Sequence, residues 1–184
     1  MKILFVDVDG TLIEPASGKQ FKEHPGDIKL MDGVVEAIAR YKAQGYVIAG
    51  ISNQQGVQYG YITLQDAVDT MRNVLSLLED IECIMFCPDK GESCYRVTHQ
   101  EWANVEAELW LSPFILDSYR KPGIGMIQYF ISHYAYKHYV YPVDPEGEVK
   151  IEDELMVGDR PEDAQCAQNA GIRFIDAHVW RQGA

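Results

Sequence analysis

The sequence predicts an α/β fold built as a three-layer, Rossmann-like parallel sheet with helices on both faces. Apolar runs of strand length recur along the chain, and amphipathic helical patterns separate them. Strands that are apolar throughout are buried on both sides, which favours a parallel sheet covered by helices on each face. The 184 residues suit one domain spanning 1–184, and no repeat, low-complexity tract or linker divides the sequence.

Five apolar runs are the expected strands, at residues 3–6, 46–51, 83–87, 154–158 and 173–175. The first helix precedes the second strand and is expected to end at Gly45. Thr63 is the expected N-cap of the second helix, and the last helix is expected to begin at Pro161 and end at Gly171. The apolar faces of the first, second and third helices comprise Val34, Val35, Ile38 and Tyr41, then Leu64, Val68, Met71, Leu75 and Leu78, then Ile127, Phe130, Ile131 and Tyr134.

Two segments do not fit this alternation and are expected to be insertions on the core fold, at about 88–119 and 137–153. The first is mixed polar and aromatic. The second contains Asp-Pro-Glu-Gly at 144–147, a turn signal compatible with a hairpin. The tyrosine-rich stretch 129–141 leaves three interpretations open: core packing at helical spacing, a surface or dimer contact, or stacking against a nucleobase.

The composition excludes several classes of protein. The formal net charge is −12, which argues against tight binding to long nucleic acid because such binding needs a basic surface, although a local basic pocket could hold a small anion. The four cysteines are too sparse for a secreted disulfide scaffold. The N-terminus turns acidic too early for a signal peptide, and no apolar run approaches the ~18 residues of a membrane span. We therefore expect a soluble, cytoplasmic protein with no membrane partner, and its oligomeric state stays open.

Two carboxylates follow the first expected strand, at Asp7 and Asp9. Side chains two residues apart on a strand point the same way, so both acids are expected to stand together where the strand ends. Like charges at close range are costly unless a cation or a shared proton relieves the repulsion. The pair therefore indicates a chemical role.

Further polar residues lie where other expected strands end. Ser52 and Asn53 follow the second strand, Asp159 follows the fourth, and Arg120 with Lys121 precedes a helix. In an open parallel sheet, ligands bind beyond the carboxyl ends of the strands. Three acids, a serine–asparagine pair and an arginine–lysine pair are therefore expected to meet at one rim.

This set of residues matches phosphoryl transfer from a small phosphate monoester. Asp7 is the expected nucleophile and would form an aspartyl-phosphate. Asp9 would donate a proton to the leaving alkoxide and then accept one from the attacking water. Ser52 and nearby backbone N–H groups would bind phosphoryl oxygens, whose charge Lys121 would compensate.

A carboxylate can approach a phosphate dianion only if the negative charge is neutralised, and oxygen-bound Mg²⁺ supplies that neutralisation. Asp159 would complete a Mg²⁺ site with Asp7. Asp163 is either a further ligand, a residue behind the ligands, or an acid that favours the first turn of its helix. Substrate selection is expected near the insertion at about 88–119.

These residues resemble the motifs of the haloacid-dehalogenase-like phosphatases, a superfamily of Mg²⁺-dependent enzymes that form an aspartyl-phosphate. Residues 7–12 fit the first motif, residues 52–54 the second, Lys121 the third and residues 158–163 the fourth, in the family's order over residues 3–175. In the first motif the leading Asp is the nucleophile and the second is the acid–base group. The resemblance also implies that the backbone carbonyl of Asp9 binds the metal.

Two narrower markers, Ser-Asn-Gln-x-Gly-Val and Arg-Lys-Pro-x-x-Gly-Met, look like one branch of the superfamily. That branch contains histidinol-phosphate phosphatases, heptose-bisphosphate phosphatases and polynucleotide 3′-phosphatases. The resemblance implies a fold without a large cap domain. With it, we expect Gly10, Thr11, Asn53 and Arg120 to contact the substrate.

The zinc loop of the small-molecule members has no counterpart in this sequence. That loop ends just before Arg-Lys-Pro, where residues 116–119 here contain no Cys. Cys87, Cys94 and His99 stand at spacings that fit no zinc pattern, so zinc is not expected. The missing loop weighs against the sugar- and amino-acid-pathway members, whereas the acidic charge weighs against polynucleotides. We favour a small phosphorylated metabolite as the substrate and keep polynucleotide 3′-phosphatase activity, on a nucleic acid end, as the alternative.

A phosphorylation-controlled receiver module is a more distant alternative. Receivers also pair acids after the first strand and place a lysine before a proline, and Asp89 lies near the end of the third expected strand. However, Ser52 comes too early in the chain for the receiver order, and the turn at Gly10 and Thr11 is foreign to it. Catalytic release of phosphate would separate an enzyme from a receiver.

Overall fold

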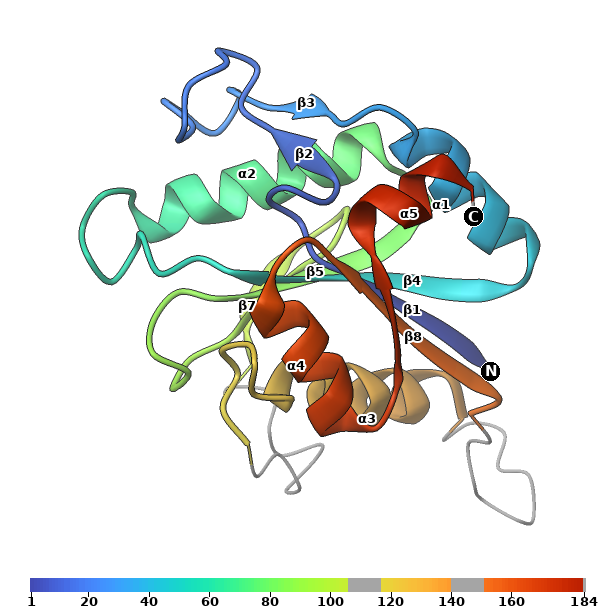
Figure 1. Cartoon of the computed structure of the whole chain (residues 1–184). Helices are drawn as coiled ribbons and strands as arrows, with labels where there is room; N and C mark the ends of the chain where they lie inside the picture. Colours follow the sequence, from blue (N-terminus) through green and yellow to red (C-terminus); the bar gives the residue numbers. More distant parts are fainter. Residues whose placement is uncertain (106–116, 140–150, 184) are drawn as a thin grey trace.

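The computed structural model describes residues 1–105, 117–139 and 151–183, in which a central sheet separates two layers of helices (Figure 1). The strands are β1 (Lys2–Val6), β2 (Ile13–Glu14), β3 (Lys29–Leu30), β4 (Tyr46–Asn53), β5 (Ile81–Cys87), β6 (Tyr95–Val97), β7 (Trp102–Asn104), β8 (Asp153–Gly158) and β9 (Arg173–Asp176). The helices are α1 (Val34–Ala43), α2 (Leu64–Leu77), α3 (Gly125–Tyr139), α4 (Pro161–Ala170) and α5 (Ala177–Gln182).

The main sheet has seven strands in the order β7-β6-β5-β4-β1-β8-β9. Strands β5, β4, β1, β8 and β9 are parallel, whereas β6 and β7 extend the sheet in antiparallel fashion. Strand β1 lies at the centre, with Val6 opposite Gly50 of β4 and Val157 of β8. The carboxyl ends of these three strands therefore meet at one edge of the sheet.

Alternate residues of each central strand pack on opposite faces of the sheet. Leu4 and Val6 of β1 join one buried cluster, with side chains of α1, α2 and α5, while Ile3 and Phe5 join another, with side chains of α3 and α4. Figure 1 shows the same division, with α1, α2 and α5 on one side of the sheet and α3 and α4 on the other. The predicted α/β class with helices on both faces is confirmed.

The predicted helix boundaries hold where a specific residue sets them. Thr63 caps α2 and forms a capping box with the third residue of the helix. Pro161 is the first residue of α4, and Gly171 ends that helix with φ +71°. Among the described helices, none is long and apolar enough to cross a membrane.

Several features differ from the expectations. Part of the insertion expected at about 88–119 forms β6 and β7, which belong to the main sheet. The sequence did not reveal these strands because three residues are too few to show periodicity. Strands β2 and β3 and helix α5 were not predicted. Val35, expected on the buried face of α1, is 54% exposed because it lies about 100° around the helix from Val34. The hairpin signal at 144–147 lies outside the described residues.

Candidate active site

The turn after β1 holds Asp7 at the carboxyl edge of the sheet. The Asp7 N–H donates to the Val157 carbonyl at 2.9 Å, which extends the pairing of β1 with β8 by one residue. The N–H of Ile13 then returns to the Val8 carbonyl at 3.1 Å. The chain therefore leaves the strand in a tight turn, and Asp7 is only 6% exposed.

Two glycines let the backbone pass close to carboxylates. Gly10 has φ +88°, and a Cβ there would lie 2.3 Å from Asp159 Oδ2. A Cβ on Gly158 would lie 2.4 Å from Asp163 Oδ2. A side chain at either position would displace an acid, so glycine is required by space at both and by backbone angle at the first.

Lys121 is the central cation of the site and is only 3% exposed. Its Nζ lies 2.5 Å from Asp7 Oδ1 and 2.7 Å from Asp163 Oδ1, and it donates to the Ile51 carbonyl at 3.0 Å. Three oxygen acceptors surround the ammonium, which satisfies its donors and restricts the side chain to one position. The lysine thus links the ends of β1 and β4 to the first turn of α4.

Asn53 holds the backbone of Lys121 in place. Its Nδ2 donates to the Lys121 carbonyl at 3.0 Å, and its Oδ1 accepts from the Lys121 N–H at 3.0 Å. This two-way bond joins the end of β4 to the segment before α3, across 68 residues of sequence. The predicted neighbours Asn53 and Lys121 therefore meet, but through the asparagine side chain and the lysine backbone.

Asp9 faces a second set of donors. Gln54 Nε2 donates to Asp9 Oδ2 at 2.6 Å and to Ser52 Oγ at 2.8 Å, so one amide connects the acid to the serine. The other carboxylate oxygen of Asp9 pairs with the ammonium of Lys22. Ser52 itself is buried. The expected meeting of the first and second motifs is therefore mediated by Gln54.

Asp7, Asp159 and Asp163 form a group of carboxylates suited to a metal ion, with one oxygen from each lying within 4.8 Å of the others. The Thr11 hydroxyl lies 3.1 Å from Asp7 Oδ2 and 3.5 Å from Asp159 Oδ1. Asp159 is exposed, so the group is open to solvent on one side. Hard oxygen ligands of this kind suit Mg²⁺.

The electrostatics of this group also favour a bound cation. Burial raises the pKa of Asp7 to about 7, an effect that Lys121 opposes and Asp163 reinforces. Desolvation likewise raises the pKa of Asp159. Burial disfavours the ammonium of Lys121, but the facing carboxylates of Asp7 and Asp163 outweigh it and raise the lysine pKa. One lysine thus faces three acids, and the excess negative charge fits a divalent cation.

Asp163 is the carboxylate of this group whose contacts are with protein donors. It is 1% exposed; its Oδ1 contacts Lys121 Nζ, and its Oδ2 accepts the N–H of Arg160 at 3.1 Å. Both oxygens are therefore engaged by protein donors. Asp159, which contacts only Thr11 among these residues, leaves more of its carboxylate available for an ion.

Arg120 and Lys121 line the same hollow at the surface. The Nη1 of Arg120 is buried and has no hydrogen-bond partner among the described residues. The hollow measures about 370 Å³ and is lined by Lys90, Asp117, Ser118, Arg120, Lys121, Pro122, Gly123 and Asn169. The hollow reaches Lys121 but not Asp7, so Arg120 faces a region beside the carboxylate group.

The three residues weighed as zinc ligands do not converge. Cys87 Sγ donates to Asp89 Oδ1 at 3.4 Å at the end of β5, and burial raises the pKa of this thiol to about 12. His99 Nε2 lies 2.9 Å from the carbonyl of Ile81, the first residue of β5. The length of that strand, about 20 Å, separates Cys87 from His99.

Three residues that contact the site were given no role from the sequence. Gln54 lies within the second motif, which was a usable signal. Lys22 lies on the segment between β2 and β3, and nothing in its sequence context marks it. Arg181, on α5, donates to the carbonyls of Gly10 and Thr11 at 3.3 and 2.9 Å. Its contact depends on where α5 packs, which the sequence does not reveal.

Comparisons with known proteins found a matching family and related sequences. Residues 2–177 match the family described as polynucleotide kinase 3 phosphatase. A relative from Thermoplasma acidophilum, named probable D-glycero-D-manno-heptose-1,7-bisphosphate 7-phosphatase, is 27% identical over 95% of this chain and 88% of its own length. The D-glycero-D-manno-heptose-1,7-bisphosphate 7-phosphatase of Chlorobaculum tepidum is 25% identical over 95% of this chain and 77% of its own length.

A solved structure shares the fold. The D,D-heptose 1,7-bisphosphate phosphatase from B. bronchiseptica, complexed with magnesium and phosphate, has a TM-score of 0.63 to this chain. The sequences are 20% identical, and the likeness covers 95% of this chain and 79% of the other.

Proposed function

This chain belongs to the polynucleotide kinase 3 phosphatase family and is a haloacid-dehalogenase-like phosphatase, and from that premise we propose that it hydrolyses a small phosphate monoester through an aspartyl-phosphate on Asp7. The observation that carries this proposal is the buried contact of Asp7 with Lys121, next to Asp159 and Asp163. A lone buried carboxylate would be protonated and unreactive, whereas a lysine and a cation keep it ionised.

In the first step an oxygen of Asp7 attacks phosphorus, and the bond from phosphorus to the ester oxygen breaks. Lys121 compensates the charge on the phosphoryl oxygens, and the Ser52 hydroxyl with nearby backbone N–H groups binds those oxygens. Asp9 gives its proton to the leaving alkoxide, so a neutral alcohol departs.

In the second step water attacks the phosphorus of the aspartyl-phosphate. Asp9, now ionised, accepts a proton from the water, and the bond between phosphorus and Asp7 breaks. Inorganic phosphate leaves, and both acids return to their starting states. Gln54, which contacts Asp9 and Ser52, keeps the acid–base group beside the oxygen-binding group.

Mg²⁺ fits the acid group, and Asp7, Asp159 and the backbone carbonyl of Asp9 would hold it. When bound, the ion supplies the positive charge that lets a carboxylate approach a phosphate dianion. We assign Asp163 to positioning Lys121, because both of its oxygens already accept protein donors. Asn53 likewise positions Lys121, since both ends of its amide bind the lysine backbone.

The substrate that we favour is a phosphorylated sugar or similar metabolite. The relatives named above are heptose-bisphosphate phosphatases, and the net charge of −12 disfavours a polynucleotide. Arg120, which lines the hollow beside Lys121, would contact the non-reacting part of the substrate.

The test is a Mg²⁺-dependent phosphate-release screen with sugar mono- and bisphosphates, histidinol phosphate, nucleotides and a 3′-phosphorylated oligonucleotide. We expect release from a sugar phosphate, its loss with a chelator and its loss in Asp7→Asn. Glu162→Gln, which removes an acid next to Asp163 but outside the acid group, is the matched control and should keep activity. Turnover by Asp7→Asn would refute the assigned nucleophile, and release only from the oligonucleotide would refute the favoured substrate class.

A further inference from the structure

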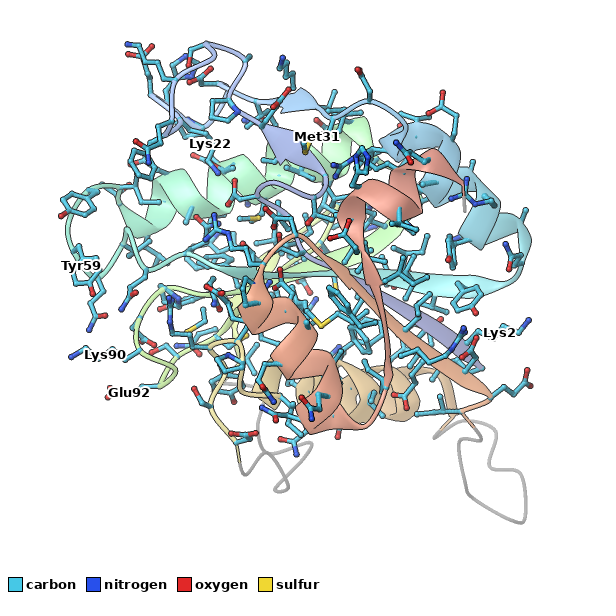
Figure 2. All side chains as sticks on the ribbon, in the orientation of Figure 1. Lys2, Lys22, Met31, Tyr59, Lys90 and Glu92 are labelled. Carbon is cyan, nitrogen blue, oxygen red and sulfur yellow. The ribbon has the colours of Figure 1, made fainter. Side chains whose placement is uncertain are left out.

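Lys22 places a second cation at the site, beside Asp9. Its ammonium pairs with Asp9 Oδ1, while Gln54 occupies Asp9 Oδ2. The side chain of Lys22 is 17% exposed, whereas Phe21 beside it is 76% exposed. In the view of Figure 2, Lys22 lies on the same side as Tyr59 and away from Lys2. The loop thus turns its lysine toward the site and its phenylalanine toward solvent.

The loop that carries Lys22, residues 15–28, is held by specific bonds. Asp27, only 5% exposed, accepts the Ser17 N–H and hydroxyl, both at 2.7 Å, and the Glu23 N–H at 2.9 Å. The bonds from Glu23 and Ser17 hold the pKa of Asp27 below its usual value, so the carboxylate stays ionised. Asn73 of α2 donates to the Pro25 carbonyl at 3.0 Å. Because Glu23 follows Lys22 directly, these bonds place the lysine.

The position of Asp9 decides what Lys22 can reach. Lys121 lies on the phosphoryl side of the reaction, whereas Asp9 must meet the ester oxygen to protonate the leaving group. Lys22 contacts Asp9 and therefore lies on the leaving-group side. Among the described residues, Lys22 is the cation in contact with this acid.

We propose that Lys22 is a specificity-determining residue that binds a second anionic group, a phosphate or carboxylate, carried by the leaving alcohol. This inference rests on the proposed function and deepens it. Without Lys22, an anion beside Asp9 would face this carboxylate with no contacting cation among the described residues, and the like charges would repel each other. Lys22 can exchange its partner from Asp9 to that anion, since a lysine has a flexible four-carbon stem and a compact charge.

The experiment compares a hexose bisphosphate with the matching hexose monophosphate, which share the reacting ester. The readout is the ratio of kcat/KM for the two substrates. Lys22→Met should lower this ratio about tenfold or more, because a charge-assisted hydrogen bond to the second anion is lost. Lys22→Arg should restore part of it, and Asp27→Asn, which loosens the loop, should lower the ratio in the same direction.

Lys19→Met is the matched control. Lys19 lies on the same loop and pairs with Glu23, but its side chain is 61% exposed. This variant removes the same charge from the loop and should leave the ratio within about twofold of the wild type, the scale expected for an exposed pair. An unchanged ratio in Lys22→Met, or an equal loss on both substrates, would overturn the proposal, since Lys22 would then act on Asp9 alone.

A binding measurement separates this inference from the proposed function. Calorimetry on Asp7→Asn gives the Kd of each sugar phosphate without turnover. Lys22→Met in that background should weaken the bisphosphate about tenfold more than the monophosphate. If the wild type hydrolyses neither ester, the proposed function fails, and the two Kd values still decide whether Lys22 selects a second anion.

Discussion

Replacing Asp7 by asparagine should stabilise the metal-free protein at neutral pH while removing the effect of Mg²⁺. Asp7 is buried beside two other carboxylates, and a single lysine faces all three. Without a metal ion, each ionised acid in this group raises the cost of ionising the next. Asparagine keeps the shape of the side chain and an oxygen for Lys121, but it carries no charge.

The magnitude follows from the pKa of Asp7, which burial raises from 3.8 to about 7. A raised pKa means that the folded state holds the proton more tightly. Asp7 therefore contributes its full stability below about pH 4 and loses it as the pH rises through about 7. About three pKa units correspond to about 4 kcal/mol, of which about 3 kcal/mol falls between about pH 4.5 and pH 7.5. For 184 residues this is about 6–12 °C in Tm.

The assay is thermal unfolding followed by circular dichroism over this pH range, with a chelator and with excess Mg²⁺. In the chelator, Tm of Asp7→Asn minus Tm of the wild type should rise with pH. Only the wild type has the buried Asp7 carboxyl group, whose ionisation destabilises the folded state. Mg²⁺ should raise Tm of the wild type and of Glu162→Gln, but much less that of Asp7→Asn. If the difference in Tm does not change with pH, Asp7 does not have a raised pKa, and the inference that burial disfavours its ionised form is wrong.

Three further outcomes test other contacts. Lys121→Ala should lower kcat on every substrate by at least about 10²-fold, because it removes the charge facing Asp7; an effect on KM alone in steady-state kinetics would contradict this role. Arg181→Ala should lower kcat about tenfold with KM little changed, because the carbonyls of Gly10 and Thr11 lose their donor. An unchanged kcat would show that the turn after β1 keeps its conformation without Arg181. Gly10→Ala should abolish the rise of Tm with Mg²⁺, since its Cβ would meet Asp159 Oδ2 at 2.3 Å; a retained rise would contradict that close approach.

The sequence predicted that the candidate site residues lie at one edge of the sheet, because the carboxyl edge of a parallel sheet follows from strand direction alone. Every parallel strand delivers its carboxyl end to the same edge. Asp7, Ser52 and Asp159 lie close together there because β4 and β8 flank β1. Lys121 was placed by its position before a helix and by its resemblance to a family motif. Its actual contacts, with Asp7, Asp163 and the Ile51 carbonyl, required the structure.

The features that could not be predicted from the sequence depend on loop conformation and on short secondary-structure elements. Strands β6 and β7 have three residues each, which is too few for a periodic signal. Lys22 reaches Asp9 from the 15–28 loop, which is held by Asp27 and by Asn73 of α2. Arg181 reaches the turn after β1 only because α5 packs beside it, across 170 residues from Thr11. Such contacts are products of tertiary packing and have no local pattern.

The two lysines of the site differ in how firmly they are held, and this difference separates their roles. Lys121 is buried among three oxygen acceptors, and Asn53 binds its backbone, so it belongs to the fixed frame that meets every phosphate. Lys22 is more exposed, comes from a loop and contacts one acid that has another donor in Gln54. Asp9 therefore keeps a partner when Lys22 leaves, which lowers the cost of the exchange. Loss of Lys121 should harm all substrates, whereas loss of Lys22 should harm most those that bring an anion to replace Asp9.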